Sequence, residues 1–121
     1  MVIIIQTLCK DSEEAKRIGR VLLEKKMASC VQIFPVQSTY WWEGKIVEEA
    51  ETELIVKTLK QNYRAVSDEI QKNHSYKTPF IGALKLSEIN GEYYRYMKTI
   101  VKKQYGRIKS RKKLSETDVK V

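Results

Sequence analysis

The stretch 40-YWWEGKIVEEAETELIVKT-58 decides the fold, because it joins two tryptophans, a tight turn and a long strand. The glycine in Glu43-Gly44-Lys45 suits the turn of a β-hairpin. Extended, β-branched and aromatic composition before and after the turn predicts two antiparallel strands, over residues 36–42 and 46–59. At about 3.3 Å per residue the second strand would exceed about 40 Å, which is longer than a domain of this size is wide. We therefore expect part of the hairpin to protrude.

Shorter elements flank the hairpin. Residues 2–5 are a β-branched run typical of a buried strand, and residues 29–34 are strand-like, with a bulge expected at Pro35. A first helix is expected to begin at Asp11 or Ser12 and to end near residue 26. After the hairpin the pattern predicts a second helix, a strand over residues 80–86 and a third helix capped by Asn90. The second and third helices present Tyr63, Val66 and Ile70, and Tyr93, Met97 and Ile100, respectively.

This βαββαβα order predicts an α+β domain of the ferredoxin-like type over residues 1–104. Right-handed crossovers place both principal helices on one face of a four-stranded antiparallel sheet. We expect Val31, Ile33 and Ile55 to leave apolar surface on the other face, which favours a second copy of the chain as its cover. Such a neighbour would also receive the hairpin. The predicted subunit interface therefore contains Tyr40, Trp41 and Trp42.

Composition bounds the class of protein. A chain of 121 residues with 42% hydrophobic residues supports one domain with a modest core. It contains no apolar run of about 18 residues, and residues 1–7 lack the features of a secretory signal. We therefore expect a cytoplasmic protein without a membrane span, in which Cys9 and Cys30 are reduced.

The net charge of +8 is concentrated near the C-terminus. Eight of the 23 basic residues lie between Lys98 and Lys113, where no acidic residue occurs, so the other 15 basic residues match the 15 acidic ones. Residues 105–121 are predicted to be a flexible basic tail. A weak phosphate-binding arm is the alternative, but no motif for reading bases accompanies it. Nucleic acid is therefore not an expected partner, apart from weak binding by the tail.

Four segments together resemble a known family: 28-ASCV-31, 40-YWWEGKI-46, 54-LIVKT-58 and 73-NHSYKTP-79. Their order and spacing are similar to those of the CutA divalent-cation-tolerance proteins, over about residues 2–100. That family shares a trimeric, ferredoxin-like architecture with the PII signalling proteins. The resemblance implies a homotrimer with a role in tolerance of divalent metal ions, copper above all. One departure weakens a metal site: Lys77 and Phe80 stand where the family often has acidic residues.

The sequence does not favour an enzyme. Nucleophilic or acid–base catalysis needs an oriented base, and His74 is the only histidine. The four glutamates at positions 48, 49, 51 and 53 are interpreted as solvated strand charges rather than as paired acids. We expect a non-enzymatic protein that requires no cofactor.

Copper is the metal that the resemblance implies, and three residues are candidate ligands. Imidazole suits Cu(II), which points to His74, and thiolate suits Cu(I), which points to Cys30 or Cys9. Two interpretations remain open for these residues. His74 also suits a packing role at a helix end, and Cys30 also suits a small buried hydrophobe.

A second function follows from the likeness to PII proteins. The clefts between subunits would then bind a small anionic metabolite or nucleotide. The residues proposed for that cleft are Trp42, Glu43, Lys57, His74 and Tyr76.

Overall fold

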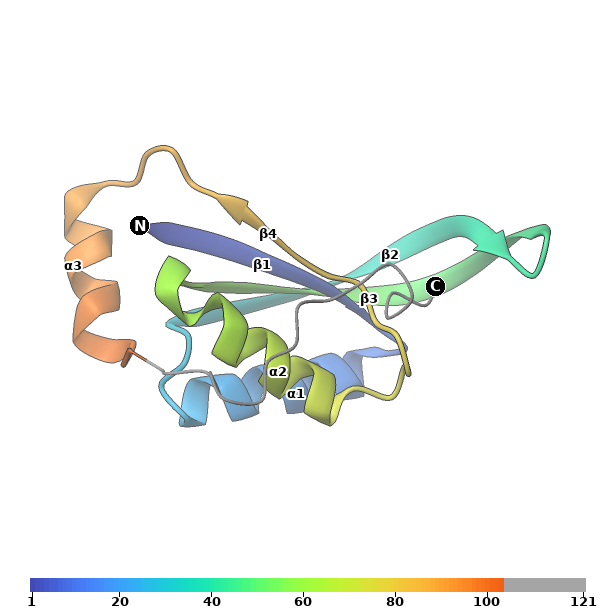
Figure 1. The fold of residues 1–121 in the computed structure, drawn as a ribbon, viewed down its shortest axis with the longest axis horizontal. Coiled ribbons are helices and arrows are strands. Elements are labelled where there is room, and N and C mark those ends of the chain that lie inside the picture. The colour runs from blue at the N-terminus through green and yellow to red at the C-terminus, as the bar shows by residue number, and fades with distance from the viewer. Residues whose placement is uncertain (104–121) are drawn as a thin grey trace.

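The computed structural model describes residues 1–103, so the predicted tail lies outside the described residues. The chain folds into one antiparallel sheet with strand order β2-β3-β1-β4, flanked by helices (Figure 1). This arrangement confirms the predicted ferredoxin-like α+β fold. None of the helices within residues 1–103 is long and apolar enough to cross a membrane. The elements are β1 (Val2–Cys9), α1 (Ser12–Glu24), β2 (Cys30–Trp42), β3 (Lys45–Leu59), η1 (Lys60–Asn62), α2 (Tyr63–Asn73), β4 (Ile81–Lys85) and α3 (Gly91–Ile100).

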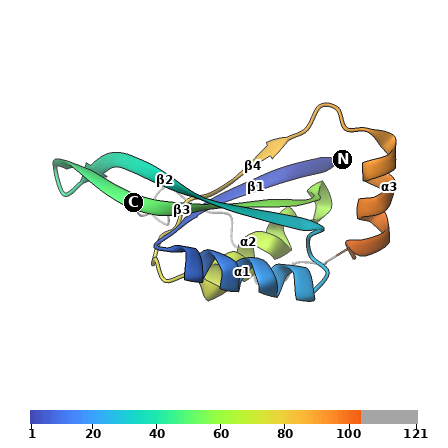
Figure 2. The ribbon, with the colours of Figure 1, turned by 180° about the vertical axis from the view of Figure 1, so that it is seen from behind.

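Helices α1 and α2 cover one face of the sheet, as the two opposite views show (Figures 1 and 2). The core between them is built from alternate strand residues, because successive strand side chains point to opposite faces. Helix α3 lies apart from α1 and α2 and packs Met97 against Val2 at the start of β1 and Leu59 at the end of β3. The main core contains Ile3 and Ile5 of β1, Leu54 and Val56 of β3, Ile18 and Leu22 of α1, and Val66 and Ile70 of α2.

The hairpin of β2 and β3 extends beyond the helices, as predicted (Figure 1). Trp42 pairs with Lys45, so only Glu43 and Gly44 form the turn. Both have positive φ, 49° and 76°, which is the pattern of a type I′ turn. This turn matches the right-handed twist of the strands and fixes their register.

The predicted bulge at Pro35 is wrong. Pairing runs without interruption from Cys30 opposite Lys57 to Trp42 opposite Lys45, and Pro35 lies opposite Thr52. Strand β2 is at the edge of the sheet. An edge strand pairs on one side only, so it accommodates a residue without an N–H group and keeps its register.

The prediction for the open face, which is the face not covered by α1 and α2, is wrong for two of its three residues. Val31 and Ile33 pack against the main core on the helix side, because they lie opposite the buried Val56 and Leu54. Ile55 alternates to the open face. The apolar surface there also includes Phe34 and Leu84, which are 40% and 58% exposed.

Candidate functional site

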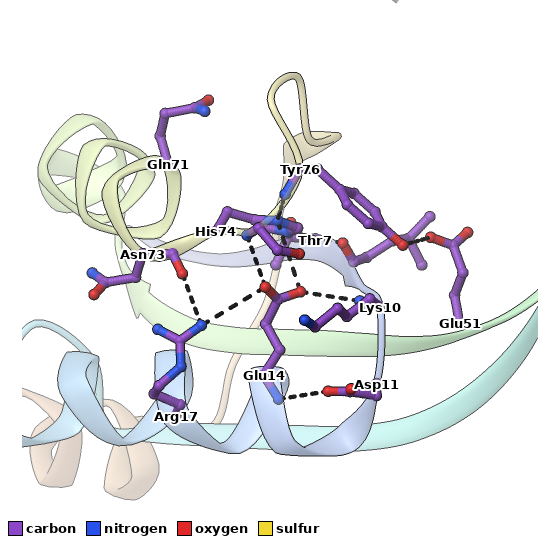
Figure 3. Close-up of polar contacts among 12 residues, drawn as sticks. Thr7, Lys10, Asp11, Glu14, Arg17, Glu51, Gln71, Asn73, His74 and Tyr76 are labelled. Atoms are coloured by element: carbon purple, nitrogen blue, oxygen red, sulfur yellow. Dashed lines mark hydrogen bonds and ion pairs between the residues drawn. The ribbon is translucent and has the colours of Figure 1, made fainter.

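His74 lies immediately after α2 and contacts the end of β1 (Figure 3). Its Nε2 atom is 2.9 Å from the carbonyl oxygen of Leu8, and its Nδ1 atom accepts the backbone N–H of Tyr76 at 3.1 Å. A carbonyl only accepts, so this pattern places the ring proton on Nε2. The side chain has no exposed surface. His74 therefore fixes the loop that follows α2 to β1.

Glu14, on the first turn of α1, is the second centre of this site. Its side chain is 1% exposed, and it accepts the backbone N–H groups of Lys10 at 3.0 Å and Ser75 at 2.7 Å. Arg17 lies 3.7 Å from the same carboxylate, and Nδ1 of His74 lies 3.9 Å from it. We call this group, Lys10, Glu14, His74 and Ser75 with the Tyr76 backbone, the Glu14–His74 clamp.

Sequence reasoning missed Glu14, although a signal was present. Asp11 caps α1 by accepting the backbone N–H of Glu14 at 2.9 Å. An acidic residue three positions after a capping residue is typical of a helix start. The spacing locates Glu14 in the first turn of the helix, but it does not show that a loop more than 60 residues later in the chain needs this carboxylate.

The ionisable groups of the clamp are held in defined protonation states. Burial raises the pKa of Glu14, but hydrogen bonds from Ser75 and Lys10, together with the nearby His74, outweigh it and lower the pKa below 4.5. Burial lowers the pKa of His74 below 6.5, against the opposing effect of Glu14. Burial also raises the pKa of the neighbouring Cys9 thiol to about 12, and Glu14 adds to this rise. At neutral pH a charged carboxylate therefore lies beside a neutral imidazole and a neutral thiol.

Cys9 and His74 come together in the fold, and Glu14 joins them. One potential ligand atom from each residue lies within 4.8 Å of the other two. The thiol and imidazole suit a soft or borderline transition-metal ion, so the donor types fit copper. In the described conformation, however, Nδ1 accepts the Tyr76 N–H and the thiol is protonated. Binding through these atoms requires release of that hydrogen bond and loss of the thiol proton.

Cys30 is not part of this group. It lies at the beginning of β2, on the open face, and pairs with Lys57. Its thiol is half-buried and contacts the carbonyl oxygen of Val31 at 3.8 Å. Neither Cys30 nor Cys9 forms a disulfide.

A groove of about 710 Å³ is lined by residues of the β2–β3 hairpin and by Tyr76, whose backbone belongs to the clamp. The side chain of Tyr76 reaches from the loop to this groove, and its hydroxyl donates to Glu51 at 2.7 Å (Figure 3). Glu51 is only 9% exposed, so its interpretation as a solvated strand charge is wrong. The sequence pattern around Glu51 did not indicate its burial, because its hydrogen-bond partner Tyr76 lies 25 positions later in the chain. The lining residues are Leu8, Ser38, Thr39, Tyr40, Trp42, Val47, Glu49, Glu51, Tyr76 and Phe80.

The five residues predicted for a ligand cleft do not meet within the chain. Trp42 and Tyr76 line the groove, and His74 lies behind Tyr76 with a ring separation of 4.9 Å. Glu43 is in the hairpin turn. Lys57 lies toward the other end of β3, with its ammonium 5.9 Å from the ring of Tyr93 on α3.

The residues predicted for a subunit interface are accessible in the single chain. Trp41 is 68% exposed and Trp42 is 51% exposed, while Tyr40 is half-buried. Trp41 and Trp42 point to opposite faces of the hairpin, because neighbouring strand residues alternate. Only Tyr40 and Trp42 line the groove.

Comparison with known sequences places this chain among proteins described by their effect on metal tolerance. The family model for the CutA1 divalent ion tolerance protein matches residues 3–100. A divalent-cation tolerance protein CutA from Archaeoglobus fulgidus is 51% identical over 74 residues, which are 61% of this chain and 72% of that protein. A protein of the same name from Thermotoga maritima is 35% identical over 100 residues, covering 83% of this chain and 99% of that one.

Solved structures agree with the sequence comparison. The periplasmic divalent cation tolerance protein CutA from Archaeoglobus fulgidus superposes with a TM-score of 0.82 at 41% identity, covering 84% of this chain and 100% of that chain. CutA1 from Pyrococcus horikoshii gives 0.81 at 31% identity, covering 84% of this chain and 99% of the other.

Proposed function

Because this chain belongs to the CutA1 divalent ion tolerance family, we propose that it is a non-enzymatic, homotrimeric protein that supports tolerance of copper and other divalent metal ions. Its relatives carry names that describe metal tolerance rather than a reaction. We place it in the cytoplasm, where its two free thiols would stay reduced. The related protein from Archaeoglobus fulgidus is described as periplasmic, and we do not extend that location to this chain.

The proximity of Cys9, Glu14 and His74 is the observation that carries the metal proposal. These residues offer a thiol, a carboxylate and an imidazole, three buried groups that would hold a copper ion between them. The family often has acidic residues at the positions of Lys77 and Phe80. In this chain Glu14 would supply the carboxylate ligand instead. When bound, the ion would supply charge that holds the thiol as thiolate. Binding through Nδ1 would release the Tyr76 N–H from His74, so we propose that it also loosens the loop after α2.

Calorimetric titration with Cu(I) and Cu(II) tests this proposal. Cys9→Ser is expected to remove most Cu(I) binding, and His74→Gln to weaken binding of both ions. Cys30→Ser is the matched control, since it removes a thiol that lies outside the cluster. Parent-like binding by both Cys9→Ser and His74→Gln would overturn the assignment.

The trimer proposal is supported by the exposed aromatic side chains on the protruding hairpin. Exposure of two tryptophans to water is unfavourable, and a neighbouring copy would bury them. Light scattering is expected to give about three times the chain mass of 14.2 kDa. Trp42→Ala is expected to weaken assembly, because truncating a buried aromatic typically costs about 3–5 kcal/mol. A monomeric parent protein would contradict the proposal.

A further inference from the structure

Arg17 is a cationic side chain held beside the group formed by Cys9, Glu14 and His74, which we call the ligand group (Figure 3). Its guanidinium lies 3.7 Å from the Glu14 carboxylate and donates to the backbone carbonyl of Asn73 at 3.0 Å. Asn73 is the last residue of α2 and directly precedes His74. Arg17 is therefore fixed between α1 and the end of α2, next to two of the three candidate ligands.

The other charged groups around the ligands are carboxylates. Glu14, Glu51 and Arg17 act electrostatically on both the thiol and the imidazole of the ligand group, and Asp11 acts on the thiol. Arg17 is the cation among them. Each carboxylate attracts a metal ion in proportion to the charge of the ion, so the carboxylates alone would favour a divalent ion. Arg17 repels the ion by the same rule and therefore opposes a divalent ion more strongly than a monovalent one.

The number and kind of ligands point in the same direction as the charge of Arg17. One thiol, one carboxylate and one imidazole come together within the described residues. Zn(II) usually takes a tetrahedral set of ligands, which is one more than this group supplies. Hard divalent ions take about six or more oxygen ligands. Thiolate and imidazole suit Cu(I), which is soft and accepts fewer ligands.

We propose that Arg17 is a specificity-determining residue of the ligand group, which it makes selective for a singly charged soft ion, Cu(I), over doubly charged ions. This inference rests on the proposed function, because it concerns the same three ligands. The guanidinium offsets the nearby carboxylates, so that a second unit of charge on the ion is repelled rather than neutralised. Cu(I) is also the form of copper expected where free thiols stay reduced.

Ag(I) and Cd(II) are suitable probes for this selectivity. Both ions are soft and keep their oxidation state during a titration, and they differ by one unit of charge. Calorimetric titration of the full chain, in its own oligomeric state, measures the affinity for each ion. The ratio of the two affinities is the readout, and the parent protein is expected to bind Ag(I) more tightly. Cu(I), kept reduced and supplied from a competing chelator, is expected to behave like Ag(I).

Substitutions of Arg17 separate its charge from its hydrogen bond. Arg17→Gln removes the charge and keeps a donor for the Asn73 carbonyl. It is expected to raise the affinity for Cd(II) relative to Ag(I) by about tenfold, the size of effect that a nearby unit charge has in partly exposed surroundings. Arg17→Lys keeps the charge and is expected to keep the ratio of the parent protein.

Arg20→Gln is the matched control on the same helix. It removes the same charge about one turn further along α1, where Arg20 pairs with the exposed Glu24. The ratio of affinities is expected to stay at the parent value. A ratio also separates selectivity from stability, because a general loosening of the Glu14–His74 clamp would weaken the binding of both ions.

The possible failures of the two proposals are distinguishable. If Cys9→Ser and His74→Gln bind both probes like the parent, the ligands are assigned wrongly, and the proposed function and this inference are both overturned. If those two variants lose binding but Arg17→Gln keeps the parent ratio, the ligands stand and only the role of Arg17 is wrong. An equal shift of the ratio by Arg20→Gln, or a parent protein that binds Cd(II) at least as tightly as Ag(I), would also overturn that role.

Discussion

The Glu14–His74 clamp and the tip of the hairpin use their side chains in opposite ways. In the clamp, a carboxylate and an imidazole are buried almost completely, and each is surrounded by backbone and side-chain partners. Within the described residues no buried side-chain nitrogen or oxygen lacks a partner. At the tip, Trp41 and Trp42 are largely exposed. A Cβ atom added at Gly44 would have no described atom outside the turn within 4 Å. The clamp is complete within one chain, whereas the hairpin offers surface to something outside it.

Glu14→Ala should produce the largest loss of stability, because it breaks the clamp at its centre. The change leaves the N–H groups of Lys10 and Ser75 without their acceptor in a partly buried place. Hydrogen bonds to a charged group typically contribute about 1.5–3 kcal/mol each, so losing these two is expected to cost about 3–5 kcal/mol. Urea denaturation of the variant measures the change in the free energy of unfolding. Glu24→Ala, at an exposed pair in the same helix, is the control and should stay within about 0.5 kcal/mol.

Gly19→Ala should have the next largest effect, within the same packed body. An added Cβ would lie 2.9 Å from the Val31 side chain and 3.5 Å from that of Leu54, so the core must shift. Overpacking of this kind typically costs about 1–3 kcal/mol, partly offset by the better helix propensity of alanine. Thermal denaturation measures the loss. Val31→Ala should recover part of it in the double variant, and additive losses would contradict the steric explanation.

Gly44→Ala tests the hairpin by a different mechanism. Nothing lies within 4 Å of the position, but its φ of 76° is unfavourable for any residue with a Cβ. The expected loss is about 1 kcal/mol, from the backbone alone. Gly44→Asn should lose less, since asparagine tolerates this conformation better. If alanine and asparagine destabilise equally, backbone conformation is not the reason that glycine occurs here.

The smallest effect expected is a change in the slope of stability against pH. The pKa of His74 is lower in the folded chain than its ordinary value of 6.5, because burial disfavours the charged ring. A lowered folded pKa means that stability is fully present above pH 6.5 and falls as the pH drops toward the folded pKa. Melting temperatures of metal-free protein between pH 7.5 and 5 measure this fall. His74→Gln should flatten the curve, and an unchanged slope would assign the effect to other groups.

The hairpin was predictable because its information is local. Glu43-Gly44 specifies the turn, and the strand composition on both sides specifies the pairing. The order of helices and strands then limits the topology to a few arrangements. Even so, the faces of Val31 and Ile33 were assigned incorrectly, because a shift of one residue in register reverses every side chain of a strand.

The candidate site was predictable only in part. The four quoted segments pointed to the family and contain His74 and Cys30, while Cys9 was a candidate only because thiolate suits Cu(I). The segments did not show that Glu14 joins His74 and Cys9, or that Glu51 bonds to Tyr76 from a position 25 residues earlier. Within one chain, His74 and Tyr76 are in contact but Lys57 lies near Tyr93 on α3, so the hypothesis of one cleft between subunits that contains all three stays a prediction.

By itself, the sequence determined the α+β class, the element order, the protruding hairpin and its turn, and the family. These properties depend on hydrophobic periodicity, turn chemistry and short motifs, which act between near neighbours in the chain. Only the tertiary structure decided that Glu14 is buried beside His74 and Cys9, and that Glu51 and Tyr76 share a groove with Trp42. Burial and charge at those positions arise from contacts between distant segments, and no pattern of neighbouring residues records them.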